Sequence, residues 1–190
     1  VRRANMIIYT KCPKEVTPIT RRITMKNVNL RPYQNLYFTT MEYGDLTPVF
    51  PEKAIPFQSK EQRMPSVLMV TGIAQPAALQ KYLSSHSDRV EAIRFPDHHS
   101  FEETDLIQIE NSFEKISVKN KIIITTEKDA TRLRDIENLS ENIQTNLFYI
   151  PIKIKFLDSE GKSFDKKILD YVRENKSNRA LHKRKNQRTR

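Results

Sequence analysis

The stretch Val90-Glu91-Ala92-Ile93-Arg94-Phe95-Pro96-Asp97-His98-His99 places a carboxylate and two imidazoles directly after a predicted strand. Its first six residues alternate in polarity as a strand does, and Pro96 ends the alternation. Ser100 and Glu103 have the spacing of a capping box, and a helical pattern of apolar residues follows as far as Ile116. The segment therefore predicts a strand, a turn that carries both histidines, and a helix.

Similar units are predicted on both sides of this segment. We expect strands at 5–10, 36–41, 66–71, 121–125 and 147–150, and helices over about 17–29, through Leu79 and Leu83, and over about 127–134. Repeated strand–helix alternation is typical of an α/β protein, in which helices flank a parallel sheet. Residues 152–156 alternate strictly and predict a half-exposed strand. An amphipathic helix is expected over about 163–175, with Ile168, Leu169 and Val172 facing inward.

The composition is that of a soluble globular chain. Its 190 residues suffice for one or two small domains, and they are 37% hydrophobic and 29% charged. The sequence contains no apolar run of the roughly 18–20 residues that a membrane span requires. Its first residues do not resemble a signal peptide. The single cysteine, Cys12, excludes an internal disulfide and fits a reducing cytosol.

The net charge of +10 is concentrated at one end of the sequence. Residues 176–190 contain seven basic residues and no acidic ones, whereas the other 175 carry 26 basic and 23 acidic residues. Such a segment predicts a disordered, solvated tail, and it leaves open contact with anionic lipid or with nucleic acid. The three glycines, Gly44, Gly72 and Gly161, are too far apart to form a phosphate-binding loop in these residues.

His98 and His99 are compatible with several kinds of chemistry. Histidines on such a turn can bind a metal, transfer a proton, contact a phosphate or simply cap the helix. One family of two-metal phosphoesterases is named for an Asp-His-His motif, but it needs further aspartates on neighbouring strands. Asp129 supplies one, and no paired Asp-x-Asp follows the first strand.

Two other strand ends carry polar residues. In the segment 125–130, the spacing of Thr126 and Asp129 predicts a helix cap. The run Glu127, Lys128 and Asp129 can equally lie beside the histidine turn and orient it. Asp105 and Glu110 have the spacing of ordinary helix surface residues.

Six segments, taken in order, resemble one known family. They are residues 5–13, 30–34, 70–74, 95–99, 125–130 and 149–152, which read NMIIYTKCP, LRPYQ, VTGIA, FPDHH, TTEKDA and YIPI. In this order and spacing they resemble the carboxyl-terminal half of the tetraacyldisaccharide 4′-kinases, also called lipid A 4′-kinases. The resemblance extends to about residue 175.

The resemblance implies an enzyme at the cytoplasmic face of the inner membrane. It would transfer the γ-phosphoryl group of ATP, with Mg²⁺, to the 4′-hydroxyl of tetraacyldisaccharide 1-phosphate, and no nucleic acid is expected as a partner. The implied fold is the end of a P-loop kinase core (1–45), a proline-rich connector (46–64) and a smaller α/β/α domain (65–150). A linker ribbon with a closing helix (151–175) and the basic tail (176–190) would follow.

The resemblance also implies roles for single residues. His98 and His99 would belong to the face that closes on the active site, oriented by Asp97 and supported by Glu127, Lys128 and Asp129; which histidine acts is left open. Thr10 and Lys11 resemble the Thr-Lys segments that lie near the nucleotide base in P-loop folds.

In the family, the phosphate-binding loop, the acidic Mg²⁺ motif and an apolar membrane contact all precede the part matched here. ATP and Mg²⁺ would be bound mainly by that absent half, and this chain alone is expected to be inactive. The alternatives are a non-enzymatic basic module that binds anionic membrane or nucleic acid, and the Asp-His-His metal phosphoesterase.

Overall fold

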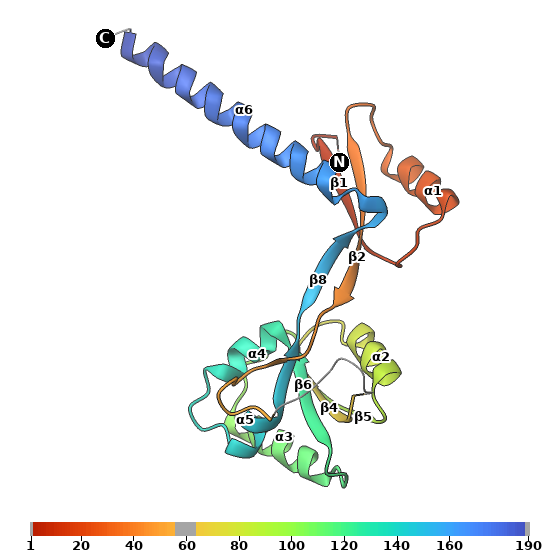
Figure 1. Cartoon of the computed structure of the whole chain (residues 1–190), viewed down its shortest axis with the longest axis vertical. Coiled ribbons are helices and arrows are strands. Elements are labelled where there is room, and N and C mark those ends of the chain that lie inside the picture. The colour runs from red at the N-terminus through yellow and green to blue at the C-terminus, as the bar shows by residue number, and fades with distance from the viewer. Residues whose placement is uncertain (1, 56–63, 189–190) are drawn as a thin grey trace. The chain divides into compact units, whose positions relative to one another are not determined.

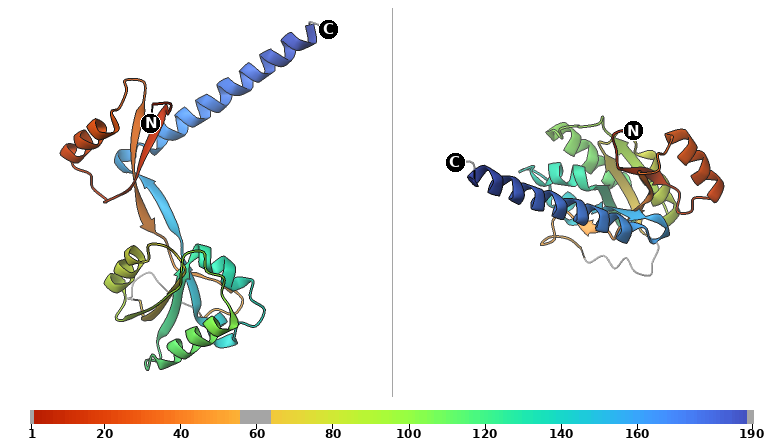
Figure 2. Two further views of the ribbon diagram at one scale, coloured as in Figure 1. Left: turned by 180° about the vertical axis from the view of Figure 1, so that it is seen from behind. Right: turned by 90° about the horizontal axis from the view of Figure 1, so that it is seen from above.

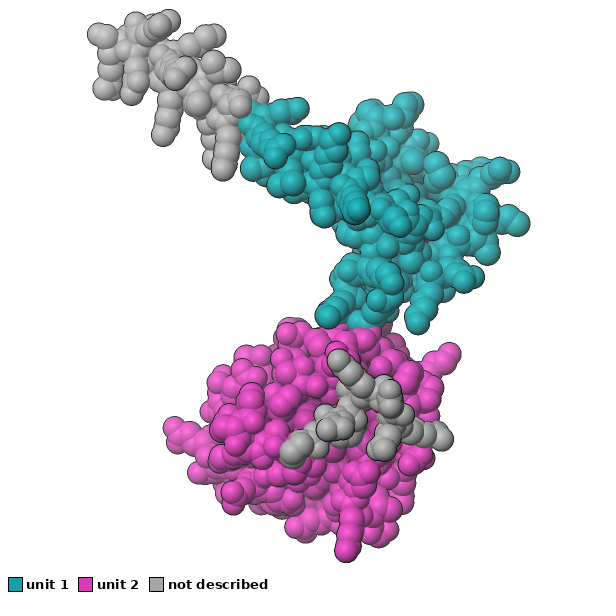
Figure 3. All heavy atoms as spheres, in the orientation of Figure 1, with its two compact units in different colours: residues 1–42, 153–190 teal, residues 43–152 magenta. Residues whose placement is uncertain are grey.

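The chain divides into two compact units. The computed structural model describes residues 2–55 and 64–188, with side chains placed as far as residue 175. Unit 1 consists of residues 1–42 and 153–190, and unit 2 consists of residues 43–152 (Figure 3). Each unit has its own sheet and is described by itself.

Unit 2 is built on a five-stranded sheet with the order β3-β7-β6-β4-β5 (Figure 1). The strands are β3 (Thr47–Pro48), β4 (Ser66–Thr71), β5 (Val90–Arg94), β6 (Lys121–Thr126) and β7 (Leu147–Ile150). The last four are mutually parallel, with β4 pairing β5 on one side and β6 on the other. The prediction of an α/β fold with a parallel sheet is therefore confirmed in this unit.

Helices cover both faces of this sheet (Figures 1 and 2). They are α2 (Ala77–His86), α3 (Glu103–Lys115), α4 (Glu127–Arg134) and α5 (Glu141–Asn146). The helices α3, α4 and α5 share one apolar cluster with the sheet, and α2 packs in a second cluster on the opposite face. Because β4 is covered on both faces, all six of its side chains are buried, as is expected of a central parallel strand.

The connector expected over 46–64 is partly a core element. Its residues Thr47 and Pro48 form an antiparallel edge strand against Tyr149 and Phe148 of β7. Val49 follows and is only 1% exposed in the main cluster of unit 2. Residues 56–63 lie outside the described part of the chain.

Helix α3 begins later than the sequence indicates. Its N-cap is Glu102, which forms a capping box with Asp105, so the expected Ser100–Glu103 box is wrong. The cause is the packing of Phe101, whose ring lies edge-on to Phe95 at 5.3 Å and keeps the chain irregular for two further residues.

Unit 1 has a three-stranded sheet with the order β1-β2-β8. Its elements are β1 (Met6–Cys12), α1 (Pro18–Val28), β2 (Asn35–Tyr43), β8 (Ile152–Phe156), a short 3₁₀ turn (Leu157–Ser159) and α6 (Gly161–Arg188). Thr17 caps α1, and a proline occupies its first turn. Asn29 ends the helix in the left-handed region, with φ 51°.

Helix α6 differs from its prediction in two ways. It continues to Arg188, where a disordered tail was expected from residue 176. Ile168, Leu169 and Val172 were expected to face inward but are 36%, 53% and 42% exposed. Burying an apolar face requires an element packed on it, and in this helix it is Phe164 that packs on Tyr37 and Phe156 of the sheet. Among the helices of the described residues, none is long and apolar enough to cross a membrane.

Charge is divided unequally between the units. By sequence, unit 1 contains 21 basic and 7 acidic residues, whereas unit 2 contains 12 basic and 16 acidic ones. The net charges are therefore +14 and −4. The basic excess thus belongs to a whole unit, not to a short tail alone.

Candidate functional site

Three strands end side by side at the carboxyl edge of the sheet in unit 2. Loops follow β4 at Gly72 and β5 at Pro96, whereas β6 passes at Thr126 directly into α4. In an open parallel sheet this is the edge where ligands bind. The three strands are adjacent, so their loops form one continuous surface.

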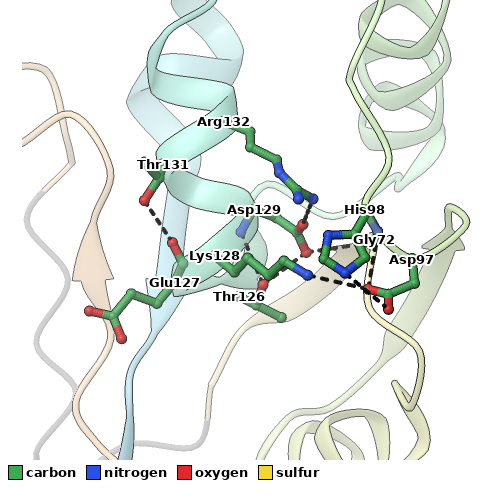
Figure 4. Close-up of polar contacts among 9 residues, drawn as sticks. All are labelled: Gly72, Asp97, His98, Thr126, Glu127, Lys128, Asp129, Thr131 and Arg132. Carbon is green, nitrogen blue, oxygen red and sulfur yellow. Dashed lines mark hydrogen bonds and ion pairs between the residues drawn. The ribbon is translucent and has the colours of Figure 1, made fainter.

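The side chain of Asp129 connects the start of α4 to the loop after β4 from within the protein. Its side chain is fully buried, and its Oδ2 accepts hydrogen bonds from the Gly72 N–H at 2.9 Å and the Thr126 hydroxyl at 2.8 Å. The guanidinium of Arg132, one turn further along α4, lies 3.3 Å from Oδ1 (Figure 4). A buried carboxylate is tolerated when it is hydrogen-bonded and paired in this way.

Gly72 has little room for a side chain. A Cβ at this position would lie 3.3 Å from the Pro96 carbonyl oxygen, 3.4 Å from Asp129 Oδ1 and 3.4 Å from His99 Cβ. The absence of that atom allows the loops after β4 and β5 to approach each other. Gly72 therefore sets the position of the histidine turn.

Asp97, His98 and Lys128 form a polar group on the surface of this edge (Figure 4). The Lys128 ammonium lies 3.3 Å from Asp97 Oδ1, which also accepts the His98 N–H at 3.0 Å. The His98 Nε2 is 3.6 Å from the other carboxylate oxygen. With 73% of its side chain exposed, His98 is free to meet a ligand.

The backbone of His98 is strained. Its φ is 62°, in the left-handed region that non-glycine residues adopt rarely. Such outliers persist where surrounding contacts enforce them, and they gather at functional sites. Here the hydrogen bond from the His98 N–H to Asp97 is one such contact.

His99 occupies the opposite kind of environment. Its ring stacks on Phe95 at 4.6 Å and 14° and meets the edge of Phe101 at 5.4 Å. Its Nε2 lies 2.7 Å from Asp105 Oδ2, and the two side chains are only 23% and 16% exposed. His99 is thus fixed in place, whereas His98 is presented to solvent.

Both carboxyl groups beside the histidines have lowered pKa values. For Asp105, burial alone would raise the pKa, but the hydrogen bonds from the Glu102 N–H and the His99 ring outweigh it. For Asp97, slight desolvation is outweighed by Lys128 and His98, so its pKa also lies below the ordinary value. Both groups are therefore ionised at neutral pH and act as hydrogen-bond acceptors.

Some of the other candidate residues lie at this site, and others lie outside it. Lys128 lies beside the histidine turn, as one interpretation of its segment predicted, and Thr126 and Asp129 form the expected cap. Glu127 points away from this group in Figure 4. Thr10 and Lys11 belong to unit 1, where Lys11 has φ 59° at a β-bulge.

Two contributors to the site were not anticipated. Asp105 was taken for a surface residue, yet it holds His99, and Gly72 was not connected with the turn. The sequence signal that could have identified Asp105 is a carboxylate six residues after a histidine, at the start of a helix. Within the described ranges, no group of three or more His, Cys, Asp or Glu side chains is arranged to hold a metal ion. The two-metal alternative requires such a group.

Comparisons with known proteins agree on one family. The family model for tetraacyldisaccharide-1-P 4′-kinase matches residues 1–173. A tetraacyldisaccharide 4′-kinase of Bacteroides thetaiotaomicron is 40% identical over 97% of this chain and 50% of its own length. One from Flavobacterium psychrophilum is 39% identical over 93% of this chain and 48% of its own length.

A solved structure, LpxK from Aquifex aeolicus in complex with ATP, is 18% identical with a TM-score of 0.44. The match covers 84% of this chain and 50% of that one. The chain thus spans about half the length of the proteins that it matches.

Proposed function

Since the chain belongs to the tetraacyldisaccharide-1-P 4′-kinase family, we propose that it forms the part of such a kinase that closes over the reacting phosphoryl group. The whole enzyme would transfer the γ-phosphoryl group of ATP to the 4′-hydroxyl of tetraacyldisaccharide 1-phosphate. The observation that carries this proposal is the exposed His98, which Asp97 and Lys128 surround at the carboxyl edge of the sheet.

His98 is the residue that would contact the phosphoryl group or the carboxylate that activates the hydroxyl. Phosphoryl transfer depends mainly on positioning and on stabilising charge, and an exposed imidazole beside an ammonium group offers hydrogen-bond donors for both. The ionised Asp97 would orient the imidazole of His98, whose Nε2 lies 3.6 Å from its carboxylate. Asp97 and Lys128 are positioning residues in this proposal.

His99 would not touch the substrate. Its stacking on Phe95 and its hydrogen bond to Asp105 support a role in fixing the position of the histidine turn at the edge of the sheet. The same reasoning applies to Asp129, which is buried and joins the neighbouring loop. Substitution of His99 or Asp129 would lower activity indirectly, by displacing His98.

Neither the phosphate-binding loop nor the Mg²⁺ site is assigned to this chain. The described residues contain no cluster suited to the ion, and the glycines of the sequence are too dispersed for the loop. When bound, Mg²⁺ would neutralise charge on the phosphates. We expect both sites in the other half of the kinase, so this chain alone would be inactive.

The charge of unit 1 supports a position on the cytoplasmic face of the inner membrane. A unit of net charge +14 is attracted to anionic lipid, by about 1 kcal/mol for each basic residue near the surface. A lipid substrate would be met there. The same charge favours nucleic acid as a second candidate, which binding to duplex DNA at physiological salt in preference to anionic vesicles would support.

A chimeric kinase tests the proposed role of His98. The chain would replace the matching half of the Bacteroides thetaiotaomicron relative, and transfer of labelled phosphate from ATP to tetraacyldisaccharide 1-phosphate would be measured. We expect His98→Ala to lower kcat by about 100-fold or more, as the loss of a group acting in the transition state does. His99→Ala should lower activity together with stability.

His86→Ala is the matched control, since His86 lies on α2 and contacts Tyr82 and Ser85. It should leave kcat within about twofold, because surface changes away from special features have small effects. Equal activity of His98→Ala and the control would refute the role of His98. An inactive chimera that carries no further substitution would count against the proposed activity itself.

A further inference from the structure

Lys128 carries its positive charge at a point where the charge does not stabilise its own helix. It is the second residue of α4, where the positive end of the helix dipole lies. The helix otherwise follows the usual rule, with acidic residues in its first turn and two arginines in its last. A cation in the first turn opposes the dipole, so helix stability does not explain this lysine.

The ion pair between Lys128 and Asp97 does not explain it either. The ammonium lies 3.3 Å from Asp97 Oδ1, and the two side chains are 43% and 39% exposed. Ion pairs exposed to this degree contribute little to stability, because water screens the charges and both side chains lose freedom. The contact therefore holds Lys128 weakly, and its ammonium can exchange Asp97 for a group of greater negative charge.

Two arginines near this edge are held by other partners. The guanidinium of Arg132 pairs with the fully buried carboxylate of Asp129, and its departure would leave that charge without its cation. Arg94 ends β5 and donates to the side chain of Gln80 on α2. Of these three cations, Lys128 is the one whose partner also borders His98.

The Lys128 ammonium and the His98 ring border the same carboxylate (Figure 4). Lys128 approaches Oδ1 of Asp97, and His98 Nε2 lies 3.6 Å from Oδ2. An anion that reaches His98 therefore comes within reach of Lys128, whose long side chain rotates freely. We propose, resting on the function proposed above, that Lys128 leaves Asp97 and binds the phosphoryl group while it is transferred.

The exchange of partners is favoured by charge. A phosphoryl group in transfer spreads its negative charge over three oxygens, and an ammonium group offers three hydrogen-bond donors to them. A group of greater charge than one carboxylate attracts the ammonium more strongly, above all where water is excluded. Lys128 donates hydrogen bonds in this step and neither gains nor loses a proton. Asp97 is then left to orient His98 alone.

A pair of substitutions separates this direct role from positioning through Asp97. In the chimeric kinase described above, Lys128→Met would be made both alone and together with Asp97→Asn. If Lys128 binds the phosphoryl group, its loss should lower kcat about 100-fold in either background, as the loss of one such donor does. If it acts only through Asp97, its loss in the Asp97→Asn background should change kcat by less than about twofold. That second result would refute the proposal.

The kinetic constants show which group Lys128 binds. We expect KM for ATP and for tetraacyldisaccharide 1-phosphate to stay within about threefold, because the contact matters chiefly in the transition state. Lys128→Arg should recover most of the kcat, since it retains a cation with several donors. Lys119→Met is the matched control, because this exposed lysine precedes β6 at the opposite edge of the sheet, and kcat should not change. An increase confined to KM for the lipid would assign Lys128 to the 1-phosphate and overturn the proposal.

A titration of the full chain tests the contact without kinase activity. Inorganic phosphate would be added at constant ionic strength, and the backbone amide resonances of His98 and Lys128 would be followed by NMR. We expect both to shift in the unchanged chain and in Lys119→Met, and neither to shift in Lys128→Met. Equal shifts in Lys128→Met, or none in the unchanged chain, would overturn the contact. An inactive chimera whose chain passes this titration would count against the proposed activity and not against the contact.

Discussion

The imidazole Nε2 of His99 lies 2.7 Å from Oδ2 of Asp105, and the same oxygen accepts the N–H of Glu102 at 2.9 Å. One carboxylate oxygen thus connects the histidine turn to the first turn of α3. Because Asp105 is ionised, the ring nitrogen is the donor in this pair. The position of His99 depends on the charge of Asp105.

Asp105→Asn should lower the stability of the protein in a pH-dependent manner. The folded pKa of Asp105 lies below its ordinary value of 3.8, so its ionised form stabilises the fold above that value. The contribution is lost as the pH falls through the lowered pKa. We expect a cost of about 1–2 kcal/mol at neutral pH, which shrinks once the pH falls well below 3.8.

Urea unfolding of both proteins across this pH range measures the difference. Asp97 titrates in the same range in both, so its effect cancels in the comparison. A difference in unfolding free energy that stays constant until the protein unfolds in acid would contradict the assigned role of the charge.

Gly72→Ala should destabilise unit 2 by about 1–3 kcal/mol, the usual cost of crowding a packed site. The new Cβ would press on the Pro96 carbonyl and on Asp129, and backbone and hydrogen-bonded atoms yield poorly. Gly161→Ala is the control, since its Cβ would meet Phe156 at an ordinary 3.5 Å. That change should be neutral or stabilising by up to about 1 kcal/mol. Thermal unfolding of both variants gives the comparison, and equal Tm shifts would disprove it.

Asp129→Ala should be the most destabilising of these changes, at about 3–5 kcal/mol. It leaves the buried Gly72 N–H and the Thr126 hydroxyl unpaired and removes the partner of Arg132. Asp135→Ala, at an exposed residue just past α4, should cost under about 0.5 kcal/mol. Denaturant unfolding monitored by circular dichroism distinguishes them. A loss below about 1 kcal/mol at Asp129 would mean that the three contacts contribute little net stability.

Lys121→Met should cost about 1–2 kcal/mol because it uncaps α3. The ammonium donates to the carbonyl of Phe113, in the last turn of α3, at 2.7 Å and to that of Ile116, its C-cap residue, at 2.8 Å. Lys119→Met, two residues earlier and exposed, is the matched control. If both variants unfold at the same urea concentration, Lys121 does not act as a cap.

Much of the fold could be predicted because its strands and helices are strongly patterned. The central strands β4 and β6 are short apolar runs between polar turns, and their positions agree with the sequence within a residue. The start of α3 was missed because Ser100 and Glu102 are both adequate caps locally. The choice between them follows from the packing of Phe101, which no local pattern contains.

The site was predictable in its place but not in its internal roles. From the predicted ends of the strands, Asp97, His98 and Lys128 could be placed at the carboxyl edge of the sheet, where the structure has them. Adjacent identical residues give no sequence signal for which one is buried, so His98 and His99 could be told apart only by their surroundings. The prediction of an inward face for α6 was wrong for a related reason. An amphipathic pattern shows which side chains a helix can bury, but it does not show whether another element packs against them.

The hydrogen bond from the Gly72 N–H to the buried Asp129 carboxylate has a consequence for motion. The loop after β4 cannot leave the sheet edge without exposing a charge that the start of α4 also encloses. The two segments should therefore open together, and the amide protons of Gly72 and Asp129 should exchange with solvent at a common free energy.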